Sequence, residues 1–172
     1  MKNIFNPRFV FITTLIILAS VSRIIPHIPN FSPVAAIALF GGVCFSNKKL
    51  AFIVPLAIMF LSDVIIGFHN TMIYVYVAFI IISAIGIYMQ EKRNVRNVLV
   101  ASLISSILFF LITNFGVWAS DPTSIGISGL IETYILGIPF FGNTILGDLF
   151  YNAILFGALY FAQLKFPRLA RA

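Results

Sequence analysis

The sequence predicts an all-α integral membrane protein with six transmembrane helices, and three observations support this prediction. Of the 172 residues, 60% are hydrophobic and only 9% are charged, and the mean hydropathy is +1.06. Such a composition is far from that of a soluble domain. The apolar residues form runs long enough to cross a bilayer, and the charged residues lie mostly between these runs. We therefore expect one transmembrane domain over residues 1–172.

The expected spans follow one another with short connections. We place them at residues 9–25, 31–46, 50–67, 71–90, 97–118 and 139–162, with an outer loop at 119–138. The first run also resembles a signal peptide, but it lacks an A-x-A site and the next run begins at once, so we expect it to be retained. Because the outer loop contains Asp121-Pro122, three glycines and Glu132, we predict only one amphipathic turn within it.

The second span is short and follows a segment that is rich in proline. Pro26, Pro29 and Pro33 remove backbone donors, so residues 26–30 are not expected to form regular helix. Ser32 is the expected N-cap, with Pro33 as the first helical position. Two interpretations fit this pattern: a broken helix that helps to form a substrate site, as in several transporters, or a tight outer turn.

The basic residues predict the orientation of the chain. With six spans, ten of the eleven fall on one side: Lys2, Arg8, Lys48, Lys49, Lys92, Arg93, Arg96, Lys165, Arg168 and Arg171. Only Arg23 falls on the other side. Positive residues mark the cytoplasmic side, so we expect both termini in the cytoplasm and the protein in a bacterial inner (plasma) membrane. This distribution explains the net charge of +6 without a nucleic-acid partner.

Polar residues within the spans gather near the outer side. They are the candidate ligand-binding residues Arg23, His27, Asn30, Asp63, His69, Asn114, Trp118, Asn143 and Asp148. Ionisable groups in membrane spans are costly and are usually paired or directed into a cavity. Their clustering at one depth predicts a polar chamber that opens outward.

Five of these residues also have a purely structural interpretation. Asn114 fits a hydrogen bond between helices, Trp118 an interfacial aromatic belt, and His27 a ring bonded to the backbone. Arg23 and Asp63 fit an ion pair between helices as well as they fit ligand contact. Because an unpaired buried arginine is expensive, we predict that Arg23 pairs with Asp63, which lies at a similar depth, rather than with Asp148.

No enzymatic motif is present, so we assign no catalytic residue and expect neither enzyme activity nor a cofactor. The sequence has no H-E-x-x-H, no G-x-S-x-G and no P-loop. The single cysteine, Cys44, excludes an internal disulfide. A metal held by His27, His69 and Asp63 stays open, because their spacing fixes no geometry. One alternative is an intramembrane enzyme that acts on a lipid-linked substrate through Asp63, Asp148 and His27, and another is a ligand-free scaffold.

The order of these features resembles the S components of energy-coupling factor transporters, which are small six-helix membrane proteins that bind substrates. The resemblance covers nearly the whole chain and includes Leu39-Phe40-Gly41-Gly42, Ser62–Gly67 and Tyr134–Phe140. The segments Pro26–Pro33 and Thr113–Trp118 more closely resemble an uncharacterised bacterial six-helix membrane family related to them.

The resemblance implies a substrate-binding uptake subunit with an outward-facing pocket for a small nutrient, either a vitamin-like molecule or a metal ion. It also implies an energising transmembrane subunit with ATPases as a partner, beside the lipid bilayer. S components typically contact that subunit through Ala-x-x-x-Ala on the first helix, which this chain lacks. The small residues of the second helix are the better expected contact surface: Ser32, Ala35, Ala36, Ala38 and Gly42.

Overall fold

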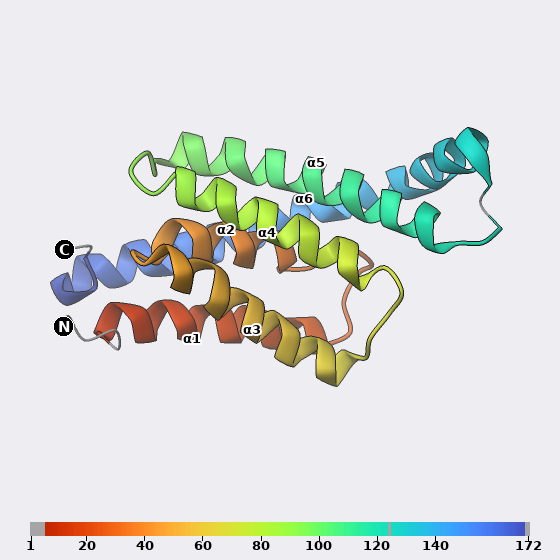
Figure 1. Ribbon diagram of the computed structural model, residues 1–172. Helices are drawn as coiled ribbons and strands as arrows, with labels where there is room; N and C mark the ends of the chain where they lie inside the picture. Colours follow the sequence, from red (N-terminus) through yellow and green to blue (C-terminus); the bar gives the residue numbers. More distant parts are fainter. Residues whose placement is uncertain (1–5, 124, 171–172) are drawn as a thin grey trace.

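The computed structural model describes residues 6–123 and 125–170, and within these the chain forms six α-helices, two 3-10 turns and no strand. The elements are α1 (Pro7–Val21), η1 (Ser22–Ile24), α2 (Val34–Cys44), α3 (Lys48–Ile66), α4 (Met72–Tyr88), α5 (Val95–Ser120), α6 (Gly126–Lys165) and η2 (Pro167–Leu169). Figure 1 shows that α1 begins and α6 ends at the same end of the bundle.

Four elements in the described residues are long and apolar enough to cross a membrane: α1 with η1, α3, α5 and α6. The other two helices, α2 and α4, are apolar but shorter, with 11 and 17 residues. Only 22 to 28% of the apolar window of each long helix is buried within the chain, so most of each window is at least partly exposed. Soluble monomers rarely expose apolar surface on this scale. The long apolar helices therefore suggest a multi-pass membrane protein.

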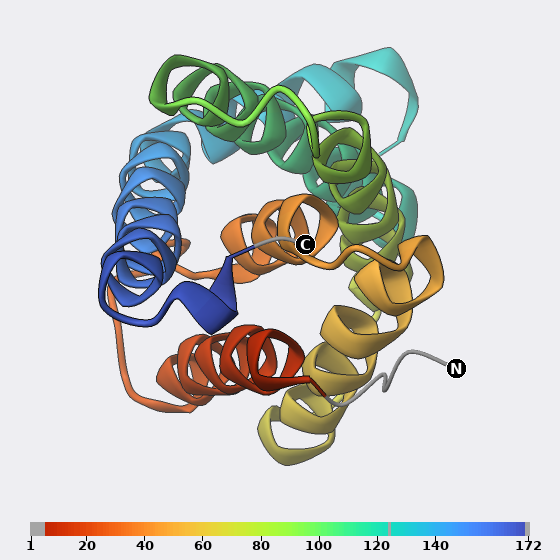
Figure 2. The same cartoon turned by 90° about the vertical axis from the view of Figure 1, so that its left-hand side faces the viewer.

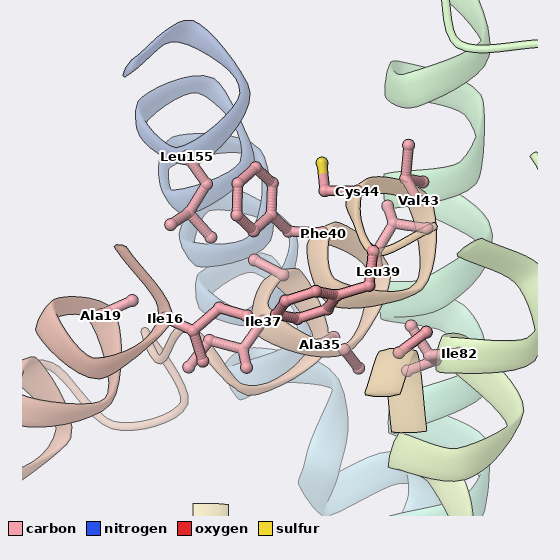
Figure 3. Close-up of a cluster of buried hydrophobic side chains, with 14 of the residues drawn as sticks. Ile16, Ala19, Ala35, Ile37, Leu39, Phe40, Val43, Cys44, Ile82 and Leu155 are labelled. Carbon is pink, nitrogen blue, oxygen red and sulfur yellow. The ribbon is translucent and has the colours of Figure 1, made fainter. Parts of the chain in front are cut away.

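The helix α2 is the centre of the bundle. All of its 11 residues are buried, and the other five helices surround it (Figure 2). Its side chains Ile37, Leu39 and Phe40 have essentially no exposed surface. Figure 3 shows how α2 packs against Ile16 of α1 and Leu155 of α6. The core of the protein is therefore built around its shortest α-helix.

Small residues allow α4 to pack very closely against α2. A Cβ atom added to Gly42 would lie 2.4 Å from the Ser83 carbonyl oxygen and 2.9 Å from the Cα of Gly86. The sequence predicts that these small residues contact the energising subunit. For the four residues that lie within α2, this prediction is wrong. Ala35, Ala36, Ala38 and Gly42 are all buried inside the chain, because close approach to neighbouring helices requires them there.

Side chains from three other parts of the chain bond the two ends of α2. At its N-terminal end, the Asp148 carboxyl group on α6 accepts a hydrogen bond from the backbone N–H of Ala36. At its C-terminal end, the Gln90 side chain donates to two backbone carbonyl groups, at 2.8 and 2.9 Å. Arg8 of α1 donates to the carbonyl of the last helical residue at 3.2 Å. These bonds partner backbone groups that a helix cannot bond internally.

The start of α2 differs from the prediction. Pro33 occupies the N-cap position and no side chain of the preceding segment caps the helix, so the predicted Ser32 cap is wrong. Asp148 of α6 bonds the N–H of Ala36 near this end instead. The prediction that residues 26–30 lack regular helix is confirmed.

The largest difference concerns the expected outer loop at 119–138. Most of it is helical, because α6 begins at Gly126 and continues without interruption to Lys165. Pro139 lies inside this helix, where proline removes one backbone donor but keeps a helical φ. The other predicted boundaries differ by a few residues.

Most of the described basic residues lie at one end of the bundle, as the sequence predicts. Eight of them lie near helix ends at the end of the bundle where α1 begins: Arg8, Lys48, Lys49, Lys92, Arg93, Arg96, Lys165 and Arg168. Arg23 follows α1 at the opposite end. Lys2 and Arg171 lie outside the described residues.

We predict that Gly86→Ala destabilises the protein, although alanine favours helix more than glycine does. The new Cβ would lie 2.6 Å from the Leu39 carbonyl oxygen and 2.9 Å from the Cα of Gly42, both rigid backbone atoms. Overpacking of this kind costs about 1 to 3 kcal/mol. Thermal unfolding of the purified protein in detergent measures the effect. Gly142→Ala on α6 is the control, because its added Cβ meets no atom within 4 Å. Equal stability of the two variants would contradict the close helix contact.

Candidate functional site

Arg23 and Asp63 form an ion pair near the end of the bundle opposite the termini. Arg23 Nη2 lies 2.7 Å from Asp63 Oδ1, and the other guanidinium nitrogen donates to the Ser62 hydroxyl. The Tyr76 hydroxyl donates to Asp63 Oδ2 at 2.7 Å. The side chains of Arg23 and Asp63 are 11% and 2% exposed. The predicted pairing is confirmed, and with both of its oxygens bonded, Asp63 joins η1, α3 and α4.

Asp148 is buried elsewhere, between α6, α5 and α2. Its side chain is 1% exposed, and its Oδ2 accepts a hydrogen bond from the Ser106 hydroxyl at 2.6 Å. It also accepts the N–H of Ala36 at the start of α2. Asp63 and Asp148 therefore bond to different partners on different helices. This arrangement gives no support to an enzyme site that uses both carboxyl groups.

The segment between η1 and α2 turns sharply over α6. The Phe31 N–H donates to the Ile28 carbonyl at 3.0 Å, which closes a four-residue turn. Pro29 and Asn30 occupy its middle positions, and Asn30 has a φ of 62°. Proline followed by a residue with positive φ is the pattern of a type II turn, and asparagine tolerates this conformation. The Asn143 side chain on α6 donates to the Pro29 carbonyl at 3.1 Å, which holds the turn in place.

An open pocket of about 670 Å³ lies between this turn, the end of α5 and the first turns of α6. We call it the outer pocket, and it is lined by Pro29, Asn30, Asn114, Val117, Asp121, Thr123, Ile125, Ser128, Gly129, Glu132, Thr133, Leu136, Gly137 and Phe140. Its volume falls within the range of pockets that bind small molecules, roughly 300 to 1,000 Å³.

The lining of the outer pocket carries negative charge. Asp121 and Glu132 contribute carboxylates, and no lysine, arginine or histidine is among the described residues that line it. Asp121 Oδ1 accepts hydrogen bonds from the N–H and the hydroxyl of Thr123, at 2.9 and 2.7 Å, which shapes the connection between α5 and α6. A neutral or cationic solute therefore fits this pocket better than an anion does.

Two of the nine candidate residues, Asn30 and Asn114, line the outer pocket. The Asn114 side chain donates to the Phe110 carbonyl of its own helix at 2.8 Å, so this bond does not join two helices. Trp118 lies beside the pocket and donates to the Gly126 carbonyl at 3.2 Å, across the α5–α6 connection.

The two histidines lie in separate exposed segments. The His27 ring Nδ1 lies 2.8 Å from the Ile25 carbonyl oxygen, which confirms the expectation that the backbone bonds this ring. His69 lies in the turn between α3 and α4. Within the residues that the structure describes, no three His, Cys, Asp or Glu side chains come close enough to hold a metal ion. The hypothesis of a metal bound by His27, His69 and Asp63 therefore has no structural support.

Sequence reasoning missed most of the polar lining, including Asp121, Ser128, Glu132 and Thr133. The glycines of this segment and its Asp121-Pro122 step predict a loop, which hides the polar helix face. A useful signal was nevertheless present, because Gly129, Glu132, Thr133 and Gly137 recur at helical spacing and share one face. A polar face on an otherwise apolar helix indicates contact with water or a solute.

Comparison with known proteins gives one result. A family model described as "Family of unknown function (DUF6580)" matches residues 3–169, nearly the whole chain. No curated protein and no solved structure gives a significant match. The match agrees with the expected uncharacterised family, and the likeness to S components stays a prediction.

We predict that Arg23→Ala destabilises the protein by about 3 to 5 kcal/mol, because it leaves the buried Asp63 carboxylate without its counter-charge. The double variant Arg23→Ala with Asp63→Asn should recover part of the loss, since it removes the stranded charge. Thermal unfolding in detergent measures both. Arg96→Ala, which removes an exposed arginine, is the control. Additive losses in the double variant would show that the two side chains are not coupled.

Proposed function

The chain belongs to the family of unknown function DUF6580, and for it we propose the role of a membrane subunit that binds a small polar solute in the outer pocket for uptake. The single observation that carries the proposal is this pocket, which is open, sized for a small molecule and lined by seven polar side chains: Asn30, Asn114, Asp121, Thr123, Ser128, Glu132 and Thr133.

We propose that all six helices lie across the bilayer, and that α2 spans it together with the segment before it. The outward-facing apolar surfaces of α1, α3, α5 and α6 support this placement. The short α2 completes its crossing with the non-helical segment before it. At about 1.5 Å per residue, α6 is about 60 Å long, roughly twice the thickness of the hydrocarbon core. Its first turns therefore extend beyond the bilayer, and they form one wall of the outer pocket.

The orientation is proposed from the basic residues, which gather at the end opposite the outer pocket. Because positive residues mark the cytoplasmic side, the outer pocket faces the exterior of a bacterial plasma membrane. Its carboxylates favour a neutral or cationic solute. Delivery through an energising transmembrane subunit with ATPases is supported by the likeness to S components.

The structure offers no observation that favours the two alternatives. An intramembrane enzyme would need a reactive carboxyl group, but Asp63 and Asp148 are both buried and bonded to protein groups. A ligand-free scaffold would not account for an open polar pocket built from three separate segments.

We predict that single cysteines placed in two connections label from opposite sides of the membrane. Thr123→Cys lies between α5 and α6, and Glu91→Cys lies between α4 and α5. Both variants carry Cys44→Ser, so that the introduced cysteine is the single thiol of the chain. A membrane-impermeant maleimide applied to intact cells should label only Thr123→Cys, and both variants should label after permeabilisation. Labelling of Glu91→Cys in intact cells would reverse the orientation.

We predict that a cationic or neutral solute stabilises the purified protein and an anionic one of similar size does not. Thermal shift in detergent with thiamine, nicotinamide and pantothenate, extended to other vitamins and amines, tests the charge class. Glu132→Gln should weaken binding of a cationic solute about tenfold, the effect of one favourable charge contact of about 1.4 kcal/mol.

Glu91→Gln is the matched control, because it removes an exposed carboxylate at the opposite end of the bundle. Equal losses in the two variants would point to net charge rather than to the pocket. If no solute in an extended panel shifts the unfolding temperature, the result contradicts the binding proposal and favours the ligand-free scaffold.

A further inference from the structure

A second pocket, of about 430 Å³, lies between α5 and α6 at the opposite end of the bundle. We call it the inner pocket. Its walls come from α5 up to Ser102 and from α6 between Leu149 and Gln163, with Cys44 at the end of α2. None of its residues lines the outer pocket.

The chemistry of the inner pocket is the reverse of that of the outer pocket. Apolar side chains dominate the wall, among them Val98, Leu149 and Phe156. The charged residue in the lining is Arg93, which lies in the connection before α5 and therefore at the mouth. In the part of the chain that the structure describes, the ion pair is that of Arg23 with Asp63, and Arg93 is not part of it.

The inner pocket also has room that the chain itself does not fill. Gly157 lines it, and a Cβ atom added there would meet no atom within 4 Å. A larger side chain would consequently project into the pocket without displacing the protein backbone. This combination describes a mostly apolar space with one cation in its lining.

We propose that the inner pocket binds an anionic phospholipid, with its phosphate beside Arg93 and an acyl chain along the apolar wall of α5 and α6. The proposal rests on the membrane placement given above, which puts the mouth at the cytoplasmic leaflet, where anionic lipids gather. Arg93 repels a cationic solute, so the inner pocket does not continue the outer one. A soluble anion would use only the exposed arginine and leave the apolar wall empty.

Lipid binding is tested on the full chain, purified in detergent and stripped of lipid. Phosphatidylglycerol and phosphatidylcholine with the same acyl chains are added, and native mass spectrometry counts the bound molecules. We expect one phosphatidylglycerol per chain, bound about tenfold more tightly than phosphatidylcholine, since one charge contact of about 1.4 kcal/mol separates them. Equal binding of the two lipids overturns the proposal.

Two glycines on α6 provide a matched pair for the position of the lipid. Gly157→Phe should abolish the bound phosphatidylglycerol, and Gly142→Phe should keep it, because an added Cβ at either site meets no atom within 4 Å and only Gly157 lines the pocket. If Gly157→Phe does not fold, Ala153→Phe fills the same pocket from the neighbouring turn. Retained binding in a folded pocket-filling variant overturns the proposal.

Two arginines provide the matched pair for charge. Arg93→Gln should weaken phosphatidylglycerol about tenfold, while Arg96→Gln, outside the lining, should leave it unchanged. Equal effects overturn the proposal in favour of general attraction to basic loops. If glycerol 3-phosphate at low millimolar concentration displaces phosphatidylglycerol, the pocket binds a soluble phosphate, and the lipid proposal is overturned. A wrong membrane placement would instead appear in the cysteine labelling, so the two failures are distinguishable.

Discussion

The burial of α2 is the constraint on which the rest of the structure depends. An α-helix leaves four N–H and four carbonyl groups without internal partners, and such groups are costly to bury. Asp148 bonds one end of α2, and Gln90 and Arg8 bond the other. These three side chains come from α6, from the residues after α4, and from α1. The backbone requirements of one short helix thus help to fix the positions of its neighbours.

This arrangement decides which polar residues remain for function. Asp63 and Asp148 are the most conspicuous residues in the apolar sequence, and both are bonded to protein groups. Their bonds to neighbouring helices hold the bundle together, which is the ordinary use of ionisable groups at this depth. In the proposed function, solute binding then falls to less conspicuous side chains, such as Thr133 and Glu132, which share one face at the exposed start of α6.

Predictions from the sequence are correct where one strong interaction of the residue itself decides the structure. Apolar runs located the helices, prolines located the break before α2, and the cost of an unpaired Arg23 predicted its partner. They fail where the tertiary structure decides. The first turns of α6 are bonded to α5 by Trp118, which donates to the Gly126 carbonyl, and by Tyr134, which donates to the Leu111 carbonyl, despite glycines and a proline that favour a loop. The central position of α2 and the capping by Asp148 depend on residues more than a hundred positions apart, which no local pattern reveals.

The region between the two pockets limits how a solute can cross. On α5 and α6 this region holds the Ser106–Asp148 hydrogen bond and a ring contact between Phe110 and Phe141, with centroids 4.6 Å apart. A straight path along α5 and α6 would separate Asp148 from α2 and strand the start of a buried helix. The path would also bring a cationic solute, which the carboxylates of the outer pocket favour, close to the positive charge of Arg93. For the proposed uptake role, release therefore requires movement of the whole bundle or a partner subunit, rather than a channel within this chain.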